Sequence, residues 1–481
     1  MNDAKKRRAS GREVELDALG ELWEKSVASL VVCRGRRRIG KSTLIGEFAR
    51  RSKAKLVLFE GVAPKPGVTN ATQLERFMRQ LSEQFGVAFQ KVGSWYEAFA
   101  KLDALLRRRS RTVVLFDEVS WMGKFDPAFP SDLKYAWDNR FKKHSNHIFV
   151  VCGSVSSWIA ENISNSTAFF GRISRDMVVG ELPLSDAAKF WGKRIERVST
   201  RDITDVLAVT GGVPKYLEDV NPSLSAAENI RRLCFRPDGP LFQDFGEIFN
   251  AVFGETLAVK RTVLESLATA PLSCAELAEK LDVKRGGTLE RNLDDLEKAG
   301  FVSKDPGLNP ETGKRARLAR YRLKDNYTRF YLKYIEPHET EIKSGRFAKI
   351  DPEGLPEWNA VMGLQFENLI LNNVEPILRK MGLDNVPVLS AAPFRKTGRG
   401  GAGCQIDLLI QTRKAVCVVE VKRRNEIGEE VEREVARKVS CLKLSGDKSV
   451  RTVLVYDGRL HPVVKANAYF DFTFDIASFL A

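Results

Sequence analysis

One short segment near the N-terminus restricts the fold of this chain more than any other feature. It places two glycines, separated by four residues, before a lysine and two hydroxyl residues: Gly35, Arg36, Arg37, Arg38, Ile39, Gly40, Lys41, Ser42 and Thr43. An apolar run precedes the segment and a helical pattern follows it. The glycines let backbone N–H groups turn inward around a phosphate, and the helix N-terminus adds a positive dipole. The segment predicts a strand, a phosphate-binding loop and a helix, with Lys41 at the β- and γ-phosphate oxygens and Ser42 at Mg²⁺.

Between residues 28 and 184, short β-branched runs alternate with longer helical patterns, which is typical of a parallel sheet covered by helices. The expected strands are residues 29–33, 55–60, 112–117, 147–152 and 177–179. Each run is largely apolar, as expected for strands buried on both faces. The chain is therefore predicted to be a multidomain α/β protein.

Two carboxylates follow the third predicted strand. Asp117 is placed to hold Mg²⁺ through water, and Glu118 is placed to polarise an attacking water. The second acid favours hydrolysis of ATP over phosphorylation of a small molecule. The alternative for Glu118 is a purely structural role in capping the loop.

Two further polar residues are candidates at the same site. Ser154 follows the fourth predicted strand, where its hydroxyl could contact the γ-phosphate or the attacking water; a simple turn is the alternative. Arg172 is a candidate for stabilising the transferring phosphate, in cis or from a neighbouring subunit of a homo-oligomer, with an ordinary surface arginine as the alternative.

These motifs together resemble the archaeal-type AAA+ ATPases of prokaryotes, which are relatives of the STAND NTPases. The resemblance rests on the arginine-rich loop, the Asp-Glu strand, the Gly-Ser pair and three further motifs: Gly11-Arg12-Glu13, Phe170-Gly171-Arg172 and Thr210-Gly211-Gly212-Val213-Pro214. It covers roughly the first 335 residues. The resemblance implies an ASCE-type P-loop sheet with a helical lid, ATP as the nucleotide, and Pro214 near the adenine. Ile39 departs from the valine that is common in the family.

The length of 481 residues favours about three domains. We expect an ATPase domain at 1–220, a helical lid with a winged helix at 221–335, a linker at 336–357 and a last domain at 358–481. The winged-helix pattern has a third helix with Leu289, Leu293 and Leu296 on its inner face. The linker is suggested by three prolines among charged residues.

Whether the winged helix binds DNA is left open by its charges. The outer face of the third helix is expected to carry Arg291, Asp294, Asp295 and Lys298, and two aspartates are unfavourable against a polyanion. The wing is more basic, with Lys314, Arg315, Arg317 and Arg320 in one hairpin. Docking without DNA contact is the alternative.

The last domain contains three acids and a lysine on one predicted helix and two predicted strands. Glu367 lies on the opening helix, Asp407 at the start of one strand, and Glu420 and Lys422 on one face of the next, because strand side chains alternate. This order resembles the PD-(D/E)xK nucleases of restriction-endonuclease-like fold. The chemistry would place Mg²⁺ on Asp407 and Glu420, Glu367 as a further member, and Lys422 at the attacking water. An exposed strand with ordinary ion pairs is the alternative.

Charge and composition favour a nucleic-acid partner. The chain has 77 lysines and arginines against 62 acids, a net charge of +15, and Lys422, Arg423 and Arg424 form a basic cluster beside the predicted site. The chain lacks an apolar run of about 18 residues, so we expect a cytoplasmic protein without membrane contact. The prediction is an ATP-hydrolysing DNA-processing or defence-type protein with a Mg²⁺-dependent nuclease domain. The alternative is a nucleotide-controlled switch whose nuclease-like tail is inactive.

Overall fold

The computed structural model describes residues 11–107, 111–154, 156–253, 257–284, 286–307, 309–310, 319–396, 403–442, 444 and 448–481. Contacts along the chain divide it into two compact units. The first contains Met1–Leu182, Gly246–Leu257 and Lys298–Gly300, and the second contains Pro183–Phe245, Ala258–Glu297 and Phe301–Ala481. None of the described helices is long and apolar enough to cross a membrane.

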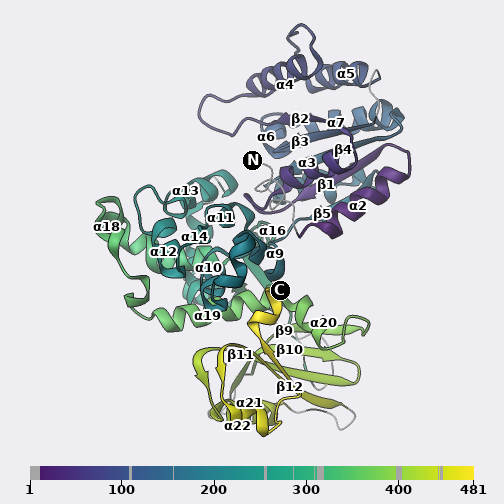
Figure 1. The fold of residues 1–481 in the computed structure, drawn as a ribbon. Helices are drawn as coiled ribbons and strands as arrows, with labels where there is room; N and C mark the ends of the chain where they lie inside the picture. The colour runs from purple at the N-terminus through teal and green to yellow at the C-terminus, as the bar shows by residue number, and fades with distance from the viewer. Residues whose placement is uncertain are drawn as a thin grey trace. The chain divides into compact units, whose positions relative to one another are not determined.

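A five-stranded parallel sheet forms the centre of the first unit (Figure 1). Its strands are β1 (Ser29–Arg34), β2 (Lys55–Glu60), β3 (Thr112–Asp117), β4 (His147–Gly153) and β5 (Ile173–Val178), in the order β2-β3-β4-β1-β5. The predicted parallel sheet is thus confirmed. The strand β5 begins four residues before the expected range, because this edge strand is exposed on one face and lacks a continuous apolar signal.

Helices cover this sheet, and an aromatic core fills one side of it. The first-unit helices that matter here are α2 (Glu13–Glu24), α3 (Lys41–Arg51), α4 (Asn70–Phe85), α5 (Trp95–Leu106), α6 (Val119–Gly123), α7 (Phe129–Asn139) and α8 (Ser156–Ile159). Phe59 and Phe116 of the sheet pack against Phe77 of α4 and Phe99 of α5. The parallel pairing of β4 with β3 and β1 places the carboxyl ends of these three strands next to one another.

The helical part of the second unit begins with α9 (Leu184–Ala188), α10 (Thr200–Thr210), α11 (Pro214–Glu218) and α12 (Ala226–Cys234), and the division between the two units falls within α13 (Pro240–Phe253). The three helices and hairpin expected next are α14 (Leu257–Thr269), α15 (Cys274–Lys280), α16 (Gly287–Lys298), β7 (Val302–Asp305) and β8 (Arg320–Leu323), with β6 (Leu272–Ser273) beside β8. Ser273 caps α15 and forms a capping box with Glu276. Lys314, Arg315 and Arg317 of the predicted wing lie outside the described residues.

The segment 336–357, which was expected to be a linker, contains regular structure and a buried side chain. Residues 336–357 contain α18 (Glu339–Lys343) and short 3₁₀ turns, and Ile342 is fully buried. Phe347 packs against Phe235, which directly follows α12. The few apolar residues among the charges and prolines therefore anchor the segment. The division between the compact units also lies at residue 182, before the boundary expected at 220, because α10 packs against α17 (Asn326–Phe330) and α19 (Trp358–Leu371).

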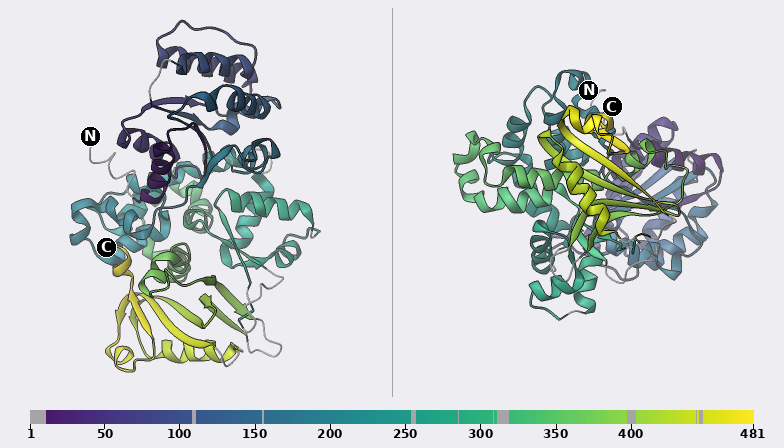
Figure 2. Two further views of the ribbon diagram at one scale, coloured as in Figure 1. Left: turned by 90° about the vertical axis from the view of Figure 1, so that its right-hand side faces the viewer. Right: turned by 90° about the horizontal axis from the view of Figure 1, so that it is seen from below.

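The C-terminal part of the second unit is a mixed sheet with helices against it (Figure 2). After α19 and α20 (Val374–Lys380) come β9 (Val388–Lys396), β10 (Cys404–Thr412), β11 (Ala415–Ile427), α21 (Glu430–Cys441), β12 (Ser449–Leu460), α22 (Pro462–Ala466) and β13 (Phe472–Asp475). The strands β9, β10 and β11 are antiparallel, whereas β11, β12 and β13 are parallel. The strands β9 and β13 were not expected, because they are mostly half-exposed edge strands.

Candidate functional site

The glycine-rich loop joins the carboxyl end of β1 to the first turn of α3. Gly40 caps α3 with a φ of 88°, and a Cβ on Gly35 would lie 2.3 Å from the carbonyl oxygen of Val179. The buried Lys41 donates from Nζ to the carbonyl oxygens of Gly35 (2.9 Å) and Arg36 (3.0 Å). The loop therefore folds back over the ammonium group of Lys41, and its two carbonyl oxygens hold this charge at the loop.

The loop arginines and their neighbours brace this turn. Arg36 is buried and lies 3.9 Å from Glu181, and the guanidinium of Arg37 lies over Trp121. The sequence identified Arg12 only through the family resemblance. In the structure its buried guanidinium donates to the carbonyl oxygens of Ile39 (3.0 Å) and Gly180 (2.7 Å). Two other residues of the predicted motif lie on either side of Gly40. Arg38 has a φ of 69°, in the left-handed region, and Thr43 is half-buried in the first turn of α3.

The acidic residues after β3 are linked to the loop and to the end of β4. The hydroxyl of Ser42 donates to Oδ2 of Asp117, and Oε2 of Glu118 accepts hydrogen bonds from the backbone N–H (3.1 Å) and the hydroxyl (2.9 Å) of Ser154. Glu118 has a φ of 50°, an unfavourable backbone conformation for a residue with a side chain. The strand order β3-β4-β1 thus brings Lys41, Ser42, Asp117, Glu118 and Ser154 to one edge of the sheet.

Arg172 and Pro214 are not brought into this group within the first unit. Arg172 precedes the amino end of β5, whereas the loop follows the carboxyl end of the parallel strand β1, so the length of a six-residue strand, about 20 Å, separates them. Arg172 binds both carboxylate oxygens of Asp138 (2.8 and 3.0 Å). At this position Arg172 is too far from the loop to stabilise the transferring phosphate in its own chain. Its action from a neighbouring subunit stays a prediction. Pro214 is buried in the second unit, where it begins α11.

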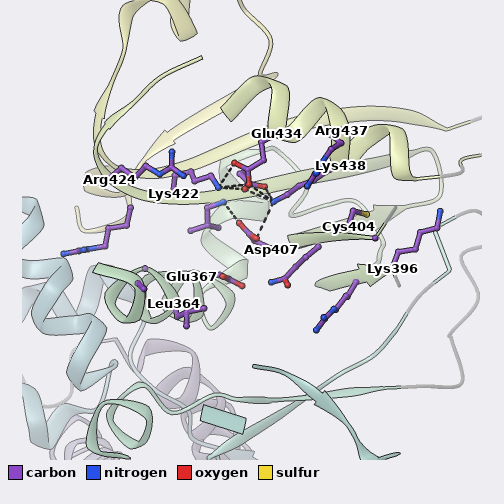
Figure 3. A pocket seen from close by; sticks show the side chains of 18 residues that line it. Leu364, Glu367, Lys396, Cys404, Asp407, Lys422, Arg424, Glu434, Arg437 and Lys438 are labelled. Carbon is purple, nitrogen blue, oxygen red and sulfur yellow. Dashed lines mark hydrogen bonds and ion pairs between the residues drawn. The ribbon is translucent and has the colours of Figure 1, made fainter. Parts of the chain in front are cut away.

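The four residues predicted in the last domain converge on one pocket of about 710 Å³ (Figure 3). Asp407 comes from β10, Glu420 and Lys422 from β11, and Glu367 from α19. Asp407 is 8% exposed and Glu420 is 0% exposed. Oδ2 of Asp407 accepts a hydrogen bond from the backbone N–H of Val421 (2.8 Å). The charges predicted from an apolar strand pattern therefore lie inside one cavity and not on an exposed strand.

A second lysine and a further acid of this pocket were not identified from the sequence. Nζ of Lys438 donates to both carboxylate oxygens of Glu420, at 2.7 and 2.6 Å. Lys422 lies 2.8 Å from Glu420 and 3.0 Å from Glu434. A signal was present, because Lys438 falls on the buried face of α21 at helical spacing from Val431 and Val435. A lysine on such an apolar face requires an acidic partner.

The carboxylates of the pocket are buried and lie close enough together to affect one another's pKa values. The pKa of Asp407 is raised to about 8, first by burial and then by the nearby carboxylates of Glu420 and Glu367. Burial also raises the pKa of Glu367. Carboxylate oxygens are ligands that Mg²⁺ prefers, and a bound divalent cation would favour their charged form. The residue types therefore fit a divalent cation. As they stand, however, the described residues include no three carboxylate, imidazole or thiol groups arranged to hold a metal ion.

The basic surroundings of the pocket differ from those expected. Arg423 points away from Lys422, because strand side chains alternate, and its buried guanidinium lies 2.6 Å from Asp205 of α10. Arg423 also lines the pocket, so its predicted contact with a phosphate backbone stays a prediction and would have to coexist with the pairing to Asp205. Arg424 is exposed and pairs with Glu430 at 3.0 Å. Two exposed arginines that were not predicted, Arg395 of β9 and Arg437 of α21, also line the pocket.

Two of the described charged residues that were predicted on the surface of the segment 257–323 lie in ion pairs. Leu289, Leu293 and Leu296 are buried as predicted. Asp295, expected on the outer face, pairs with Lys260 of α14 at 2.6 Å. Arg320 binds Glu276 at 2.7 Å. Arg291 and Asp294 remain exposed on α16.

Residues 10–220 match a family described as an ATPase domain predominantly from Archaea. The uncharacterized protein MJECL04 of Methanocaldococcus jannaschii is 24% identical over 418 residues, which are 85% of this chain and 86% of that protein. The chain is also similar to the solved structure of the Walker-type ATPase PABY2304 of Pyrococcus abyssi (16% identity, TM-score 0.45, 67% of this chain and 95% of that one). A second solved structure is the ORC2 protein of Aeropyrum pernix (14% identity, TM-score 0.42, 70% and 94%). Residues 10–220 are thus a P-loop ATPase domain, which implies nucleotide binding.

The raised pKa of Asp407 predicts that the free energy of unfolding of the chain depends on pH. Between about pH 4 and 8 the unfolded chain has lost this proton while the folded chain retains it, so stability should fall as pH rises. Asp407→Asn should remove this loss. In EDTA the variant should unfold at a higher temperature than the wild type at pH 8, by roughly 2–4 °C for each kcal/mol, and the difference should shrink toward pH 4.

Thermal unfolding of the full chain across this pH range measures the effect. Glu375→Gln is the matched control, because Glu375 is an exposed acid of the same C-terminal part. A difference between Asp407→Asn and the wild type that does not change with pH would contradict this account of the pocket.

Proposed function

We propose that this chain is an ATP-hydrolysing DNA-processing or defence-type protein of the cytoplasm, and that residues 358–481 are a Mg²⁺-dependent nuclease of the PD-(D/E)xK type. The observation that carries the nuclease proposal is the convergence of Glu367, Asp407, Glu420 and Lys422 in one pocket. These residues come from one helix and two strands. A structural ion-pair network would not need this order of acids and lysine.

In the ATPase domain each residue at the sheet edge has a role that its contacts support. Lys41 would exchange its two carbonyl partners for the β- and γ-phosphate oxygens, while Ser42 and Asp117 would hold Mg²⁺. Glu118 would polarise the attacking water, and its two hydrogen bonds with Ser154 would set the direction of its carboxylate. Ser154 would therefore act through Glu118. Arg172 would act from a neighbouring subunit, and Pro214 would lie near the adenine.

In the nuclease domain Asp407 and Glu420 would hold Mg²⁺, with Glu367 completing the carboxylate set. The bound ion would supply Lewis-acid stabilisation of the phosphate. Lys422 would hold the attacking water with its ammonium group, which Glu420 and Glu434 orient. The backbone N–H of Val421 would keep Asp407 in place through its hydrogen bond.

The proposed contact with DNA lies around this pocket. Figure 3 shows Arg437 of α21 and Arg424 on opposite sides of it, and Arg395 of β9 also lines it. Cations on both sides of the carboxylates suit a phosphodiester backbone that crosses the pocket. The segment 257–323 would be a winged helix. The pairing of Arg320 with Glu276 and the exposed Asp294 favour docking over reading of bases by this module.

One observation favours a second candidate function. Both oxygens of Glu420 are already bound by Lys438, as in a structural ion-pair network. In that case the protein would be a nucleotide-controlled switch or regulator, and its tail would bind DNA without cutting it. Metal-dependent cleavage distinguishes the two functions.

The ATPase proposal predicts that two substitutions separate binding from hydrolysis. Lys41→Ala should abolish tight ATP binding, because the ammonium charge on the phosphate oxygens is lost. Glu118→Gln should retain ATP binding and lose steady-state phosphate release by at least about 100-fold. Wild-type phosphate release by Glu118→Gln would contradict the assignment of the catalytic base. Equilibrium nucleotide binding and phosphate release are the two measurements.

The nuclease proposal predicts that metal binding and cleavage depend on different residues. Asp407→Ala should eliminate cleavage and reduce the thermal stabilisation by Mn²⁺, because a ligand of the ion is lost. Lys422→Ala should also lose cleavage but keep the stabilisation, since the lysine is not a ligand. The assays are a thermal shift with and without Mn²⁺ and nicking of supercoiled DNA in the presence of ATP. A wild type that shows neither effect would favour the switch.

The proposed DNA path predicts a change in salt dependence. Replacing Arg395 and Arg437 together by glutamine should weaken DNA binding and reduce the slope of log affinity against log salt by roughly 0.9 for each phosphate that is no longer neutralised. The matched control is glutamine at Arg413 and Lys414, exposed residues between β10 and β11 at the ends of these strands away from the pocket. Equal slopes for both double variants would place the DNA elsewhere.

A further inference from the structure

We propose that the ammonium group of Lys438 occupies the position between Asp407 and Glu420 that a divalent cation would take, so that the lysine and the metal ion compete for the site. This inference rests on the proposed function, because it concerns the same carboxylates. It adds a residue that controls their access to metal. It also explains why the acids of this pocket, among the described residues, are not arranged to hold a metal ion.

The distances place Lys438 at the centre of the carboxylate group. Its Nζ lies 2.6 and 2.7 Å from the two oxygens of Glu420 and 3.9 Å from Oδ1 of Asp407. Mg²⁺ binds oxygen at about 2.0–2.1 Å, so an ion shared by Asp407 and Glu420 would overlap the ammonium group. Lys438 is 7% exposed and Glu420 is 0% exposed, so bulk water would screen little of the repulsion between the ammonium group and a divalent cation beside it. Metal binding therefore requires Lys438 to move.

Lys422 does not obstruct the site in the same way. It lies 2.8 Å from Oε1 of Glu420 and 3.0 Å from Glu434. The structure gives it no contact with Asp407. It therefore lies to one side of the pair, where the PD-(D/E)xK resemblance places a lysine that acts on water. Figure 3 shows the two lysines approaching the acids from different elements, Lys422 from β11 and Lys438 from α21.

A second acid offers Lys438 an alternative partner. Glu434 lies one helical turn before it on α21, 3.5 Å from its Nζ. The side chain of Glu434 is 33% exposed, whereas that of Glu420 is 1% exposed. A change of side-chain rotamer can therefore move the ammonium group from Glu420 to Glu434 without leaving its charge unpaired. Glu434 would serve as the acceptor for the displaced lysine.

The test is a Mn²⁺ titration of the full chain followed by thermal unfolding. Lys438→Met keeps the aliphatic side chain and removes the charge. In EDTA it should unfold at a lower temperature than the wild type, because Glu420 loses a buried partner. Its apparent affinity for Mn²⁺ should rise by about tenfold or more, because no ammonium group must be displaced. Lys465→Met, at an exposed lysine of α22, is the matched control and should change neither quantity.

A second variant keeps the proposal testable if Lys438→Met does not fold. Glu434→Gln removes the acceptor for the displaced lysine, so the apparent affinity for Mn²⁺ should fall by several-fold relative to the wild type. Unchanged or weaker Mn²⁺ binding by Lys438→Met overturns the proposal. If that variant does not fold, unchanged or stronger binding by Glu434→Gln overturns it.

Nicking of supercoiled DNA separates this inference from the proposed function. If the wild type nicks DNA and Lys438→Met binds Mn²⁺ no more tightly, competition is wrong and the nuclease function stands. If the wild type neither binds Mn²⁺ nor nicks while Lys438→Met gains Mn²⁺ binding, competition is supported and the nuclease function is overturned. If neither protein binds Mn²⁺, both proposals are wrong.

Discussion

Both candidate sites depend on one constraint: a charged group that folding removes from water must have a partner of opposite charge or a set of hydrogen bonds. In the first unit the loop carbonyls surround the ammonium group of Lys41, and Ser154 donates to Glu118. In the second unit two lysines surround the fully buried Glu420. These partners hold each group in a definite direction, which is what a site needs before a ligand arrives.

The same constraint joins the C-terminal sheet to the helices before it. Arg423, one residue after Lys422, binds Asp205 of α10, and Arg201 of α10 lies 3.3 Å from Asp457 of β12. Buried pairs of this kind contribute little net stability, but removing one partner leaves an uncompensated charge. The position of β11 is therefore tied to that of α10 within the second unit. The alternation of strand side chains directs Lys422 into the pocket and Arg423 to this contact.

Several features could be predicted from particular residues because they depend on local pattern. The segments before Gly35 and up to Asp117 each contain four consecutive apolar residues, so β1 and β3 were expected within one residue of their observed bounds. The edge strands β5, β9 and β13 were missed or shortened because a half-exposed strand carries a weaker signal. The PD-(D/E)xK order predicted which four residues would meet, although Glu367 and Glu420 lie on different elements.

The sequence by itself determined the phosphate loop, the acids beyond β3 and the residue types of the C-terminal pocket, because backbone geometry and strand alternation are local properties. Only the tertiary structure decided what each charge contacts. It paired Glu118 with Ser154, turned Arg423 to Asp205, and brought Lys438 from α21 to both oxygens of Glu420. The reason is physical: a buried charge takes the partner that the packing of distant elements brings within hydrogen-bond distance, and no local pattern specifies that distance.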